Sequence, residues 1–600
     1  PEPDGLEGFH PTVAHWFRTR IGQPTSPQRL GWPEIAAGRS ALITAPTGAG
    51  KTLAAFLVAL NELLQLGLSG DMPEGVHVLY VSPLKALNND ISRNLEAPLS
   101  EIRAMCLAEG IPFPDIRKAV RTGDTSPSER QAMLKKPPHI LITTPESLFL
   151  LLTSTKASLL LKGVKYLIVD EIHAVFGSKR GTHLSLSMER LAAAAAPGLI
   201  RIGLSATVRP YELASRFLGG YDALGKPCPV TLVAPELDKL KDLRIALPVP
   251  DFRSLEAGSV WPDIYDTVER LVKAHTATIV FVNNRATAER IAANVNDLAG
   301  EELCVPHHGS LSRERRQLIE ARFKSGDLRC MVATATLELG IDIGQVDLMI
   351  QISAPITISG GLQRLGRAGH RLDAVSRGRI IPKTRGDLLK SLYVAQEMEA
   401  GQIEATRLPR EPLDVLAQHL VSMSCTGRWT ETDLLAVIRR SASYHELRES
   451  DLRRVLSMLS GDYEHKEDIP AKPRLMWDRI NGVVEGTPYS RMLAVSAGGT
   501  IPDRGMFPVV LADGRMRIGE LDEEYVFESR QGDVFMLGNT PWRMEKIERD
   551  RVVVTPAAST HGAETPFWRG DGLGMPLEQG LRYGRFVRTL EERLLAGTLV

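Results

Sequence analysis

Short apolar runs alternate with amphipathic stretches through the first part of the chain. Between residues 41 and 210 the apolar runs have the length of buried strands, and the stretches between them have helical periodicity. The runs are Ala41–Thr44, Val76–Val81, Ile140–Thr143, Val164–Val169 and Ile200–Leu204, and Leu53–Leu66 is one of the helical stretches. This pattern predicts βα units built on a parallel sheet.

A second series of apolar runs repeats this pattern within residues 278–354. Its members are Thr278–Val282, Cys330–Ala333 and Leu348–Ile350. The two series also resemble each other weakly, since His77–Pro83 is similar to Thr278–Asn284. We therefore predict two similarly built α/β domains, separated by the proline-rich passages at 227–250.

Helical periodicity replaces the strand pattern from Glu411 onward. One helix face carries Leu413, Leu416, Leu420 and Met423. Thr430 is placed to cap a second helix, and a third is predicted over Ser450–Leu459. The apolar stretches Gly482–Val484 and Met492–Val495 then flank Gly486-Thr487-Pro488, which predicts a hairpin. Three helices followed by a hairpin are typical of a winged-helix module.

The last hundred residues predict short strands. An Asp513-Gly514 turn separates Val509–Leu511 from Met516–Ile518, and Val534–Leu537 and Val552–Thr555 follow. A chain of 600 residues is too long for one core. We place the domains at 1–225, 226–408, 409–502 and 503–600.

The composition is that of an ordinary globular protein, with 43% hydrophobic and 24% charged residues and a net charge of zero. Nucleic-acid binding must therefore rest on local geometry rather than on a global basic field. The five cysteines are scattered, which disfavours a disulfide framework or a zinc cluster and fits a reducing compartment. No apolar run approaches the ~20 residues of a membrane helix, and no signal peptide is recognisable. We expect a cytoplasmic protein with no membrane partner, and, because the chain begins at a proline, a trimmed N-terminus.

The segment Ala45–Thr52 reads Ala-Pro-Thr-Gly-Ala-Gly-Lys-Thr and predicts a phosphate-binding loop. Its glycines allow backbone N–H groups to turn inward around phosphates, Lys51 reaches the β- and γ-phosphates, and the Thr52 hydroxyl is offered to Mg²⁺. Thr47, Gly48 and Gly50 complete the predicted nucleotide contacts. The first position is Ala45 instead of the usual glycine.

An acidic pair follows the buried-strand run Tyr166–Val169. Asp170 supplies a carboxylate for the metal, and Glu171 supplies one that polarises water, at the strand edge where open α/β sheets place ligands. Together with the phosphate-binding loop, this pair predicts nucleoside triphosphate hydrolysis with ATP and Mg²⁺. Ser205-Ala206-Thr207 follows another strand, where its hydroxyls are placed to bridge the acidic pair to what binds across the cleft.

The segment Gln363–Arg371 contains three arginines and two glycines in nine residues. An arginine presented by a partner domain stabilises the charge that develops on the γ-phosphate. The alternative is a solvated basic helix start, and the segment alone leaves both interpretations open.

These segments resemble motifs of superfamily 2 helicases. Motifs I, II, III and VI correspond to Ala45–Thr52, Asp170–His173, Ser205–Thr207 and Gln363–Arg371. Motifs Ia, Ib, IV and V correspond to Ser82–Leu87, Thr144–Ser147, Phe281–Arg285 and Thr334–Asp342. More narrowly, the chain resembles the large helicase-related (Lhr) family, with Pro412–Ala417, Gly498–Arg504 and Gly519–Glu524 as further matches. Generic helicases lack the last two stretches, and the resemblance spans essentially the whole chain.

The resemblance implies two tandem RecA-like parallel-sheet domains, a winged-helix domain and a β-rich fourth domain that is incomplete here. It implies a 3′-to-5′ translocase on single-stranded DNA that unwinds DNA duplexes and RNA–DNA hybrids, acts in DNA repair with other repair proteins, and associates with the nucleoid.

The resemblance also assigns roles to single residues. Gln28 is similar to the adenine-reading glutamine, Asp342 to a ribose contact, and Arg367 to the arginine finger, with Gln363 beside it in the catalytic group. Thr144 and Arg285 are similar to residues that hold phosphates of the tracked strand, and Trp542 to one that stacks on a base. Where many relatives in the superfamily have a second arginine, this chain has His370, followed by Arg371.

Two alternatives remain at the level of the sequence. One is an RNA helicase built on the same motor. The other is a nucleotide-gated scaffold that binds repair partners and hydrolyses ATP slowly. The presence of both Glu171 and Arg367 argues against the scaffold. For Trp542, a core tryptophan on a β-strand is an equal alternative, although its place after Gly538 predicts a position at a loop end.

Overall fold

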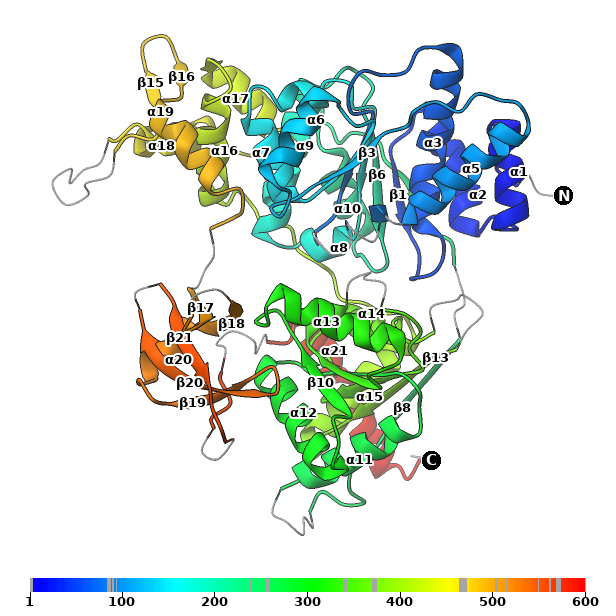
Figure 1. Ribbon diagram of the computed structural model, residues 1–600, viewed down its shortest axis with the longest axis vertical. Coiled ribbons are helices and arrows are strands. Elements are labelled where there is room, and N and C mark those ends of the chain that lie inside the picture. The colour runs from blue at the N-terminus through cyan, green and yellow to red at the C-terminus, as the bar shows by residue number, and fades with distance from the viewer. Residues whose placement is uncertain are drawn as a thin grey trace. The chain divides into compact units, whose positions relative to one another are not determined.

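The protein is described by a computed structural model of residues 4–598 (Figure 1). Short segments within that range are not described, namely 84–87, 89–90, 93, 237–239, 254–258, 339–342, 370–374, 463–471, 502–504, 514–515, 549, 560–562 and 568–573. Asp342, His370 and Arg371 lie outside the described residues, as does most of the predicted motif Ia. The chain forms two compact units, Pro1–Leu237 with Thr406–Ile501, and Asp238–Ala405 with Pro502–Val600.

The first unit contains a seven-stranded parallel sheet in the order β3-β4-β2-β5-β6-β1-β7. Its strands are β1 (Ala41–Thr44), β2 (Val78–Val81), β3 (Lys118–Arg121), β4 (Ile140–Thr143), β5 (Tyr166–Val169), β6 (Ile200–Ser205) and β7 (Thr231–Val233). Its helices are α1 (Pro11–Arg20), α2 (Ser26–Ala36), α3 (Lys51–Ser69), α5 (Glu96–Ala108), α6 (Pro127–Lys135), α7 (Pro145–Thr153), α8 (Ile172–Val175), α9 (Lys179–Ala194) and α10 (Tyr211–Gly219). The predicted α/β class is confirmed. Since β7 pairs with β1, the sheet continues past residue 225, where we placed the first boundary.

The apolar faces of this sheet are covered on both sides, which explains why its central strands are continuous apolar runs. By length and composition alone, helix α3, with its 19 residues, is apolar enough to cross a membrane. The expectation that no apolar run approaches this length is therefore wrong for α3. More than half of its apolar window is buried against the sheet, and this burial accounts for its composition.

The second unit contains a six-stranded parallel sheet in the order β10-β11-β9-β12-β13-β8. Its strands are β8 (Lys241–Ile245), β9 (Thr278–Phe281), β10 (Cys304–His307), β11 (Cys330–Ala333), β12 (Leu348–Ile352) and β13 (Ser376–Ile381). Its helices are α11 (Trp261–Lys273), α12 (Arg285–Ala299), α13 (Arg313–Ser325), α14 (Ile358–Leu365) and α15 (Arg385–Glu399). The prediction of a second α/β domain is confirmed, and its sheet core lies around β9, β11 and β12.

The winged-helix domain belongs to the first unit. It consists of α16 (Leu413–Ser424), α17 (Glu431–Ile438), α18 (Glu449–Leu459) and α19 (Pro488–Ser496), with β14 (Trp429–Thr430), β15 (Met476–Asp478) and β16 (Val483–Glu485). Thr430 caps α17 as predicted, since its hydroxyl accepts a hydrogen bond from the Asp433 N–H. The prediction of a strand at Met492–Val495 is wrong. Thr487 forms a capping box and Pro488 occupies the first turn, so this apolar run is helical, and β15 is the partner of β16.

The winged helix packs on α7 and α9 of the first α/β domain, beside which it lies in Figure 1. Three hydroxyl pairs join the two domains, Thr153 with Ser422, Thr182 with Ser443 and Ser185 with Ser441. Leu186 of α9 contributes to the winged-helix core. These paired buried hydroxyls and the shared apolar core join the two domains into one packed body.

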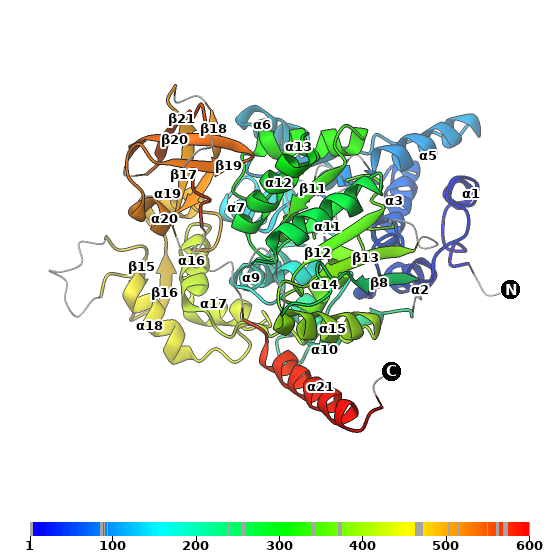
Figure 2. The same cartoon turned by 90° about the horizontal axis from the view of Figure 1, so that it is seen from below.

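The predicted β-rich fourth domain is a five-stranded sheet in the order β18-β17-β21-β20-β19, within the second unit. Its elements are β17 (Met506–Leu511), β18 (Arg517–Asp522), α20 (Glu523–Glu528), β19 (Val534–Leu537), β20 (Thr540–Ile547) and β21 (Val552–Pro556). A final helix, α21 (Leu577–Leu595), was not predicted. It packs on α15, as Figure 2 shows, with Tyr583 and Phe586 against Tyr393.

Candidate active site

The predicted phosphate-binding loop connects β1 to α3. Gly48 and Gly50 have φ values of 86° and 76°, which only glycine adopts readily, and Gly50 is the N-cap of α3. The loop therefore delivers the free N–H groups of the α3 N-terminus to one point, as phosphate binding requires. Lys51 lies over the loop, and its Nζ donates to the carbonyl oxygens of Ala45 and Pro46 at 2.6 and 3.0 Å.

Gln28, the predicted adenine contact, is buried against this loop. Its Nε2 donates to the Gly50 carbonyl oxygen at 3.2 Å, and its Oε1 accepts from the Thr25 N–H at 2.9 Å. The Thr25 hydroxyl donates to the Ala49 carbonyl oxygen at 2.9 Å. A Cβ atom on Gly50 would lie 2.6 Å from Gln28 Nε2. Gln28 and the loop thus fit together only because position 50 is glycine.

The acidic pair lies at the carboxyl end of β5. Since β6 separates β5 from β1 in the sheet, the ends of these three strands meet along one edge. Glu171 has a left-handed φ of 48°, which turns the chain sharply between the strand and α8. Such a conformation costs a non-glycine residue about 1–2 kcal/mol, and strain of this kind is concentrated at functional sites.

Asp170 is held by two donors. The Tyr80 hydroxyl donates to one carboxylate oxygen, and the Glu171 N–H donates to the other at 2.7 Å. Tyr80 is fully buried on β2, and its ring stacks on Phe56 of α3, with 5.3 Å between the ring centroids. These contacts fix the carboxylate orientation beside the phosphate-binding loop. The hydroxyl of Thr52 and the carboxylate of Asp170 are oxygen ligands, which suit Mg²⁺ together with substrate phosphates.

Burial and the neighbouring charge of Glu171 raise the pKa of Asp170 from 3.8 to about 6, although the Lys51 ammonium acts in the opposite direction. Burial also raises the pKa of Tyr80 well above its ordinary value, with the charge of Asp170 adding to the effect. The tyrosine therefore stays a hydrogen-bond donor. A cation near Asp170 would compensate the unfavourable carboxylate charge.

Ser205 connects its own segment to the acidic pair. Its hydroxyl lies 3.0 Å from His173 Nδ1, and His173 Nε2 lies 3.4 Å from the Glu171 carboxylate. The Ser205 carbonyl oxygen accepts from the Ala45 N–H at 3.1 Å. The Ser205 hydroxyl thus reaches the acidic pair through His173, while the bridge from this pair to what binds across the cleft stays a prediction.

The arginine-rich segment lies in the second unit, at the end of α14. Arg364 is buried and donates to Glu338 and Gln351 side chains at 2.7 and 2.6 Å, which gives it a structural role. Arg367 is also buried, and its Nη2 donates to the Glu338 carbonyl oxygen at 3.0 Å. Gln363 is half-buried on α14. The roles of Gln363 and Arg367 in catalysis remain predictions.

Two predicted phosphate contacts lie at helix N-termini. Thr144 is buried as the N-cap of α7, and its hydroxyl accepts from the Ser147 N–H at 3.3 Å. Arg285 is the first residue of α12, and its Nη1 donates to the Ser310 hydroxyl at 2.9 Å. The first turn of α7 is also tied to Pro83 by Arg180, which donates to Glu146 and to the Pro83 carbonyl oxygen. Helix N-termini are common phosphate sites, so both positions suit the predicted contacts.

Trp542 is half-buried within strand β20, and its indole N–H donates to the Leu537 carbonyl oxygen at 3.0 Å. The prediction that it lies at a loop end is wrong. Gly538 and Asn539 have φ values of 67° and 61°, as a two-residue hairpin turn requires, and β20 therefore begins at Thr540. The tryptophan is the third residue of this strand.

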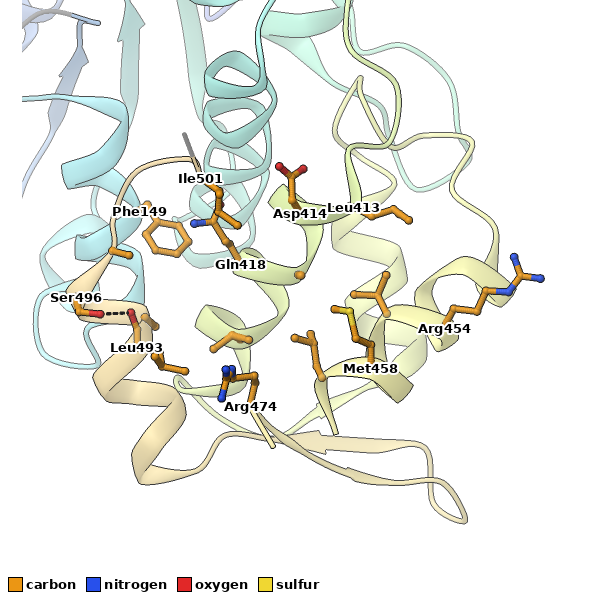
Figure 3. A pocket seen from close by; sticks show the side chains of 16 residues that line it. Phe149, Leu413, Asp414, Gln418, Arg454, Met458, Arg474, Leu493, Ser496 and Ile501 are labelled. Atoms are coloured by element: carbon orange, nitrogen blue, oxygen red, sulfur yellow. Dashed lines mark hydrogen bonds between the residues drawn. The ribbon is translucent and has the colours of Figure 1, made fainter. Parts of the chain in front are cut away.

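A large cavity lies in the winged-helix domain, outside the nucleotide site. It has a volume of about 760 Å³ and is lined by α16, α18 and α19, together with Phe149 of α7 (Figure 3). Most of its lining is apolar, with Gln418 and Arg474 among the polar residues. Its lining residues include none of the phosphate-binding loop or of the acidic pair.

Sequence reasoning missed three residues that organise these sites. Tyr80 is a hydroxyl within an otherwise apolar strand, Glu338 accepts from both arginines, and Glu289 is a carboxylate on the buried face of α12. In the first and third cases the available signal was a polar residue among apolar ones, since Tyr80 stands between Leu79 and Val81, and Glu289 stands beside Ala288 and near Ile291.

Three family models match the chain. "DEAD/DEAH box helicase" matches residues 25–214, "Helicase conserved C-terminal domain" matches 263–371, and "Large helicase-related protein, winged helix domain" matches 396–564. These matches cover most of both α/β domains, and all of the winged helix and of the five-stranded sheet.

Two relatives show how far the similarity extends. "Lhr helicase/ probable uracil glycosylase" of Mycolicibacterium smegmatis is 44% identical over 98% of this chain and 41% of the relative. "ATP-dependent helicase Lhr-Core protein 2" of Thermococcus barophilus is 40% identical over 97% of this chain and 67% of the relative. The chain thus spans about two fifths of the length of the first relative. The solved structure of Mycobacterium smegmatis helicase Lhr bound to ssDNA and AMP-PNP matches with a TM-score of 0.79 at 43% identity, over 97% of this chain and 70% of that one.

Proposed function

The chain belongs to the large helicase-related (Lhr) family, and on this basis we propose that it is an ATP-dependent motor that moves along single-stranded DNA and unwinds duplexes. The observation that carries the proposal is the meeting of the phosphate-binding loop, Asp170 and Glu171 at one edge of the first sheet. A similar protein, the Mycobacterium smegmatis Lhr, has been solved with ssDNA and an ATP analogue.

In the proposed reaction, the N-terminus of α3 and Lys51 hold the nucleotide phosphates. Thr52 and Asp170 hold Mg²⁺, which when bound supplies charge neutralisation at the β- and γ-phosphates. Glu171 orients the attacking water and accepts its proton, and His173 positions the Glu171 carboxylate. Arg367 and Gln363 of the second α/β domain act on the charge that develops at the γ-phosphate, Asp342 contacts the ribose and Gln28 the adenine.

We further propose 3′-to-5′ movement, with activity on RNA–DNA hybrids as well as on DNA duplexes. Thr144 and Arg285 hold phosphates of the tracked strand, and Trp542 stacks on a base. Phosphate contacts from two domains grip any sequence, and an aromatic platform adds about 1–3 kcal/mol per base. A role in DNA repair, with repair proteins as partners at the nucleoid, completes the proposal.

Steady-state ATP hydrolysis with single-stranded DNA, with RNA and without polymer tests the substrate. DNA stimulation is the expected result. Preferential stimulation by RNA would instead favour an RNA helicase, and the absence of stimulation would favour a nucleotide-gated scaffold. Partial duplexes with a 3′ or a 5′ tail, and the matching RNA–DNA hybrid, test direction and substrate range.

Glu171→Gln tests the hydrolytic assignment. We expect intact ATP binding and a loss of turnover of at least about 10²-fold, because the amide cannot accept the proton from water. Glu212→Gln is the matched control, since Glu212 is exposed on α10 and outside the site. Near wild-type turnover in the Glu171 variant would contradict the assignment.

A further inference from the structure

A buried carboxylate of the second α/β domain contacts the hairpin that carries Trp542. Glu289, on α12, is 2% exposed. Its Oε1 accepts from the Gly538 N–H at 2.7 Å, and its Oε2 is 3.3 Å from the Asn539 N–H. These two amides form the turn between β19 and β20.

Glu289 is also oriented from within its own domain. His308, itself fully buried, lies with Nε2 2.9 Å from Glu289 Oε1. A buried carboxylate is tolerated only where several donors compensate for its loss of water. One histidine and two turn amides meet that need here, and hydrogen bonds of this kind depend on direction as well as distance.

Two further contacts hold the turn against the same domain. Arg315 Nη2 donates to the Gly538 carbonyl oxygen at 3.3 Å, and Asn539 Nδ2 donates to the Cys304 carbonyl oxygen at 3.4 Å. Because β20 begins directly after the turn, fixing the turn fixes Trp542 three residues beyond Asn539.

The sheet is docked a second time along β18. The Glu520 N–H donates to the Ser310 carbonyl oxygen at 2.7 Å, and the Ser312 N–H donates to the Ile518 carbonyl oxygen at 2.8 Å. A Cβ atom on Gly519 would lie 2.1 Å from the Ser310 carbonyl oxygen, so this close approach requires glycine. Ser310 also accepts the hydrogen bond from Arg285.

Arg285 and Glu289 are four residues apart on α12 and therefore share a helix face. Through Ser310 and the hairpin turn, this face contacts both docking points of the five-stranded sheet. The predicted phosphate contact at Arg285 and the predicted base contact at Trp542 are thereby held at a fixed separation.

We propose that Glu289 is a positioning residue that makes the Trp542 hairpin and α12 move as one body, so that movement of the second α/β domain is transmitted to the base contact. This inference rests on the proposed function as a DNA motor. It assigns Glu289 no contact with DNA or nucleotide.

The test compares Glu289→Ala and Glu289→Gln with Glu320→Ala. The control is matched, because Glu320, on α13, pairs with the neighbouring histidine, His307, at 3.0 Å. Among the described residues, its hydrogen bond and ion pair are made to His307 and not to the hairpin. Hydrogen exchange at the Gly538 and Asn539 amides should be at least about 10-fold faster in Glu289→Ala and unchanged in Glu320→Ala, since exchange reports local opening. Glu289→Gln keeps one carbonyl acceptor and should be intermediate.

Function is measured on the same proteins. DNA-stimulated ATP turnover should stay within about threefold of wild type, while base pairs opened per ATP fall at least about fivefold, as in Trp542→Ala, because stacking on the strand is lost. A 2-aminopurine base in the single strand should lose its stacking signal in both the Glu289 and the Trp542 variants.

Two results would overturn the inference. One is unchanged amide exchange or unchanged opening per ATP in both Glu289 variants. The other is a parallel loss of ATP turnover, unwinding and thermal stability, which would make Glu289 a packing residue. Absence of DNA-stimulated turnover in the wild-type protein would contradict the proposed function instead, whereas amide exchange tests the Glu289 contact whether or not the protein unwinds DNA.

Discussion

Replacing the metal carboxylate Asp170 by asparagine should stabilise the metal-free protein while abolishing its activity. The pKa of Asp170 is raised from 3.8 to about 6 by burial and by the charge of Glu171. At neutral pH the ionised carboxylate is therefore held in an environment that disfavours it. Asparagine removes the charge and keeps both contacts, since its amide oxygen can accept from the Glu171 N–H and its amide nitrogen can donate to the Tyr80 hydroxyl.

The free energy of unfolding depends on pH because the folded and unfolded states bind the Asp170 proton with different affinity. A carboxyl whose pKa is higher in the folded state binds its proton more tightly there, so its contribution to stability declines as the pH rises from about 4 through 6. A shift of about two units corresponds to about 3 kcal/mol. Burying the new amide offsets part of this difference, so we expect a gain of about 1–3 kcal/mol above pH 7. Below pH 4 the wild-type carboxyl is protonated, so this gain disappears and the variant should be no more stable than wild type.

Thermal melting with EDTA between pH 4 and pH 8 measures this effect on the transition of the first unit. A gain of that size corresponds to a rise in melting temperature of about 2–10 °C. Asp115→Asn is the control, and it should lower the melting temperature at neutral pH. Lys136 and Arg117 lower the pKa of the exposed Asp115, so its charge is favourable in the folded state. A melting temperature of Asp170→Asn below that of wild type at pH 7.5, or a difference that does not change with pH, would refute the reasoning.

Two other substitutions test the candidate site. Gly50→Ala and Gly38→Ala should each lose about 1–2 kcal/mol of stability, since both positions have positive φ, 76° and 79°. Only the Gly50→Ala side chain would displace Gln28, so only this variant should bind a fluorescent ATP analogue more weakly. Equal binding by the two variants would contradict the Gln28 contact. Arg367→Ala should reduce DNA-stimulated turnover by about 10³-fold with nucleotide affinity nearly unchanged. A matching loss of affinity would make Arg367 a structural arginine like Arg364.

The buried strands could be predicted from the sequence because their apolar runs are uninterrupted. Ala41–Thr44, Ile140–Thr143 and Cys330–Ala333 have the predicted bounds. The edge strands β3 and β8 were missed, since an edge strand is partly solvated and carries charged residues that blur the pattern. The apolar run Met492–Val495 was misread because four apolar residues fit a strand and a helix equally well, and only the preceding Thr487-Pro488 distinguishes them.

The nucleotide loop and the acidic pair could be predicted because their chemistry depends on residues adjacent in sequence. The distant residues that hold functional side chains in place could not be identified in this way. Tyr80 is 90 positions from Asp170, and Glu289 is 249 positions from Gly538. Local periodicity contains no information about which distant segments meet, since that depends on how whole sheets and domains pack.

The sequence nevertheless marks such residues, although it does not name their partners. Tyr80 stands in the strand Val78–Val81, and Glu289 stands between Ala288 and Ile291 on the buried face of α12. A hydroxyl or carboxylate removed from water is costly unless it is hydrogen-bonded, so each of these positions implies a partner elsewhere in the chain. The partner of Tyr80 is the metal carboxylate, and that of Glu289 is the turn before Trp542. In both cases a polar residue among apolar neighbours forms hydrogen bonds that position a functional residue on a different helix or strand.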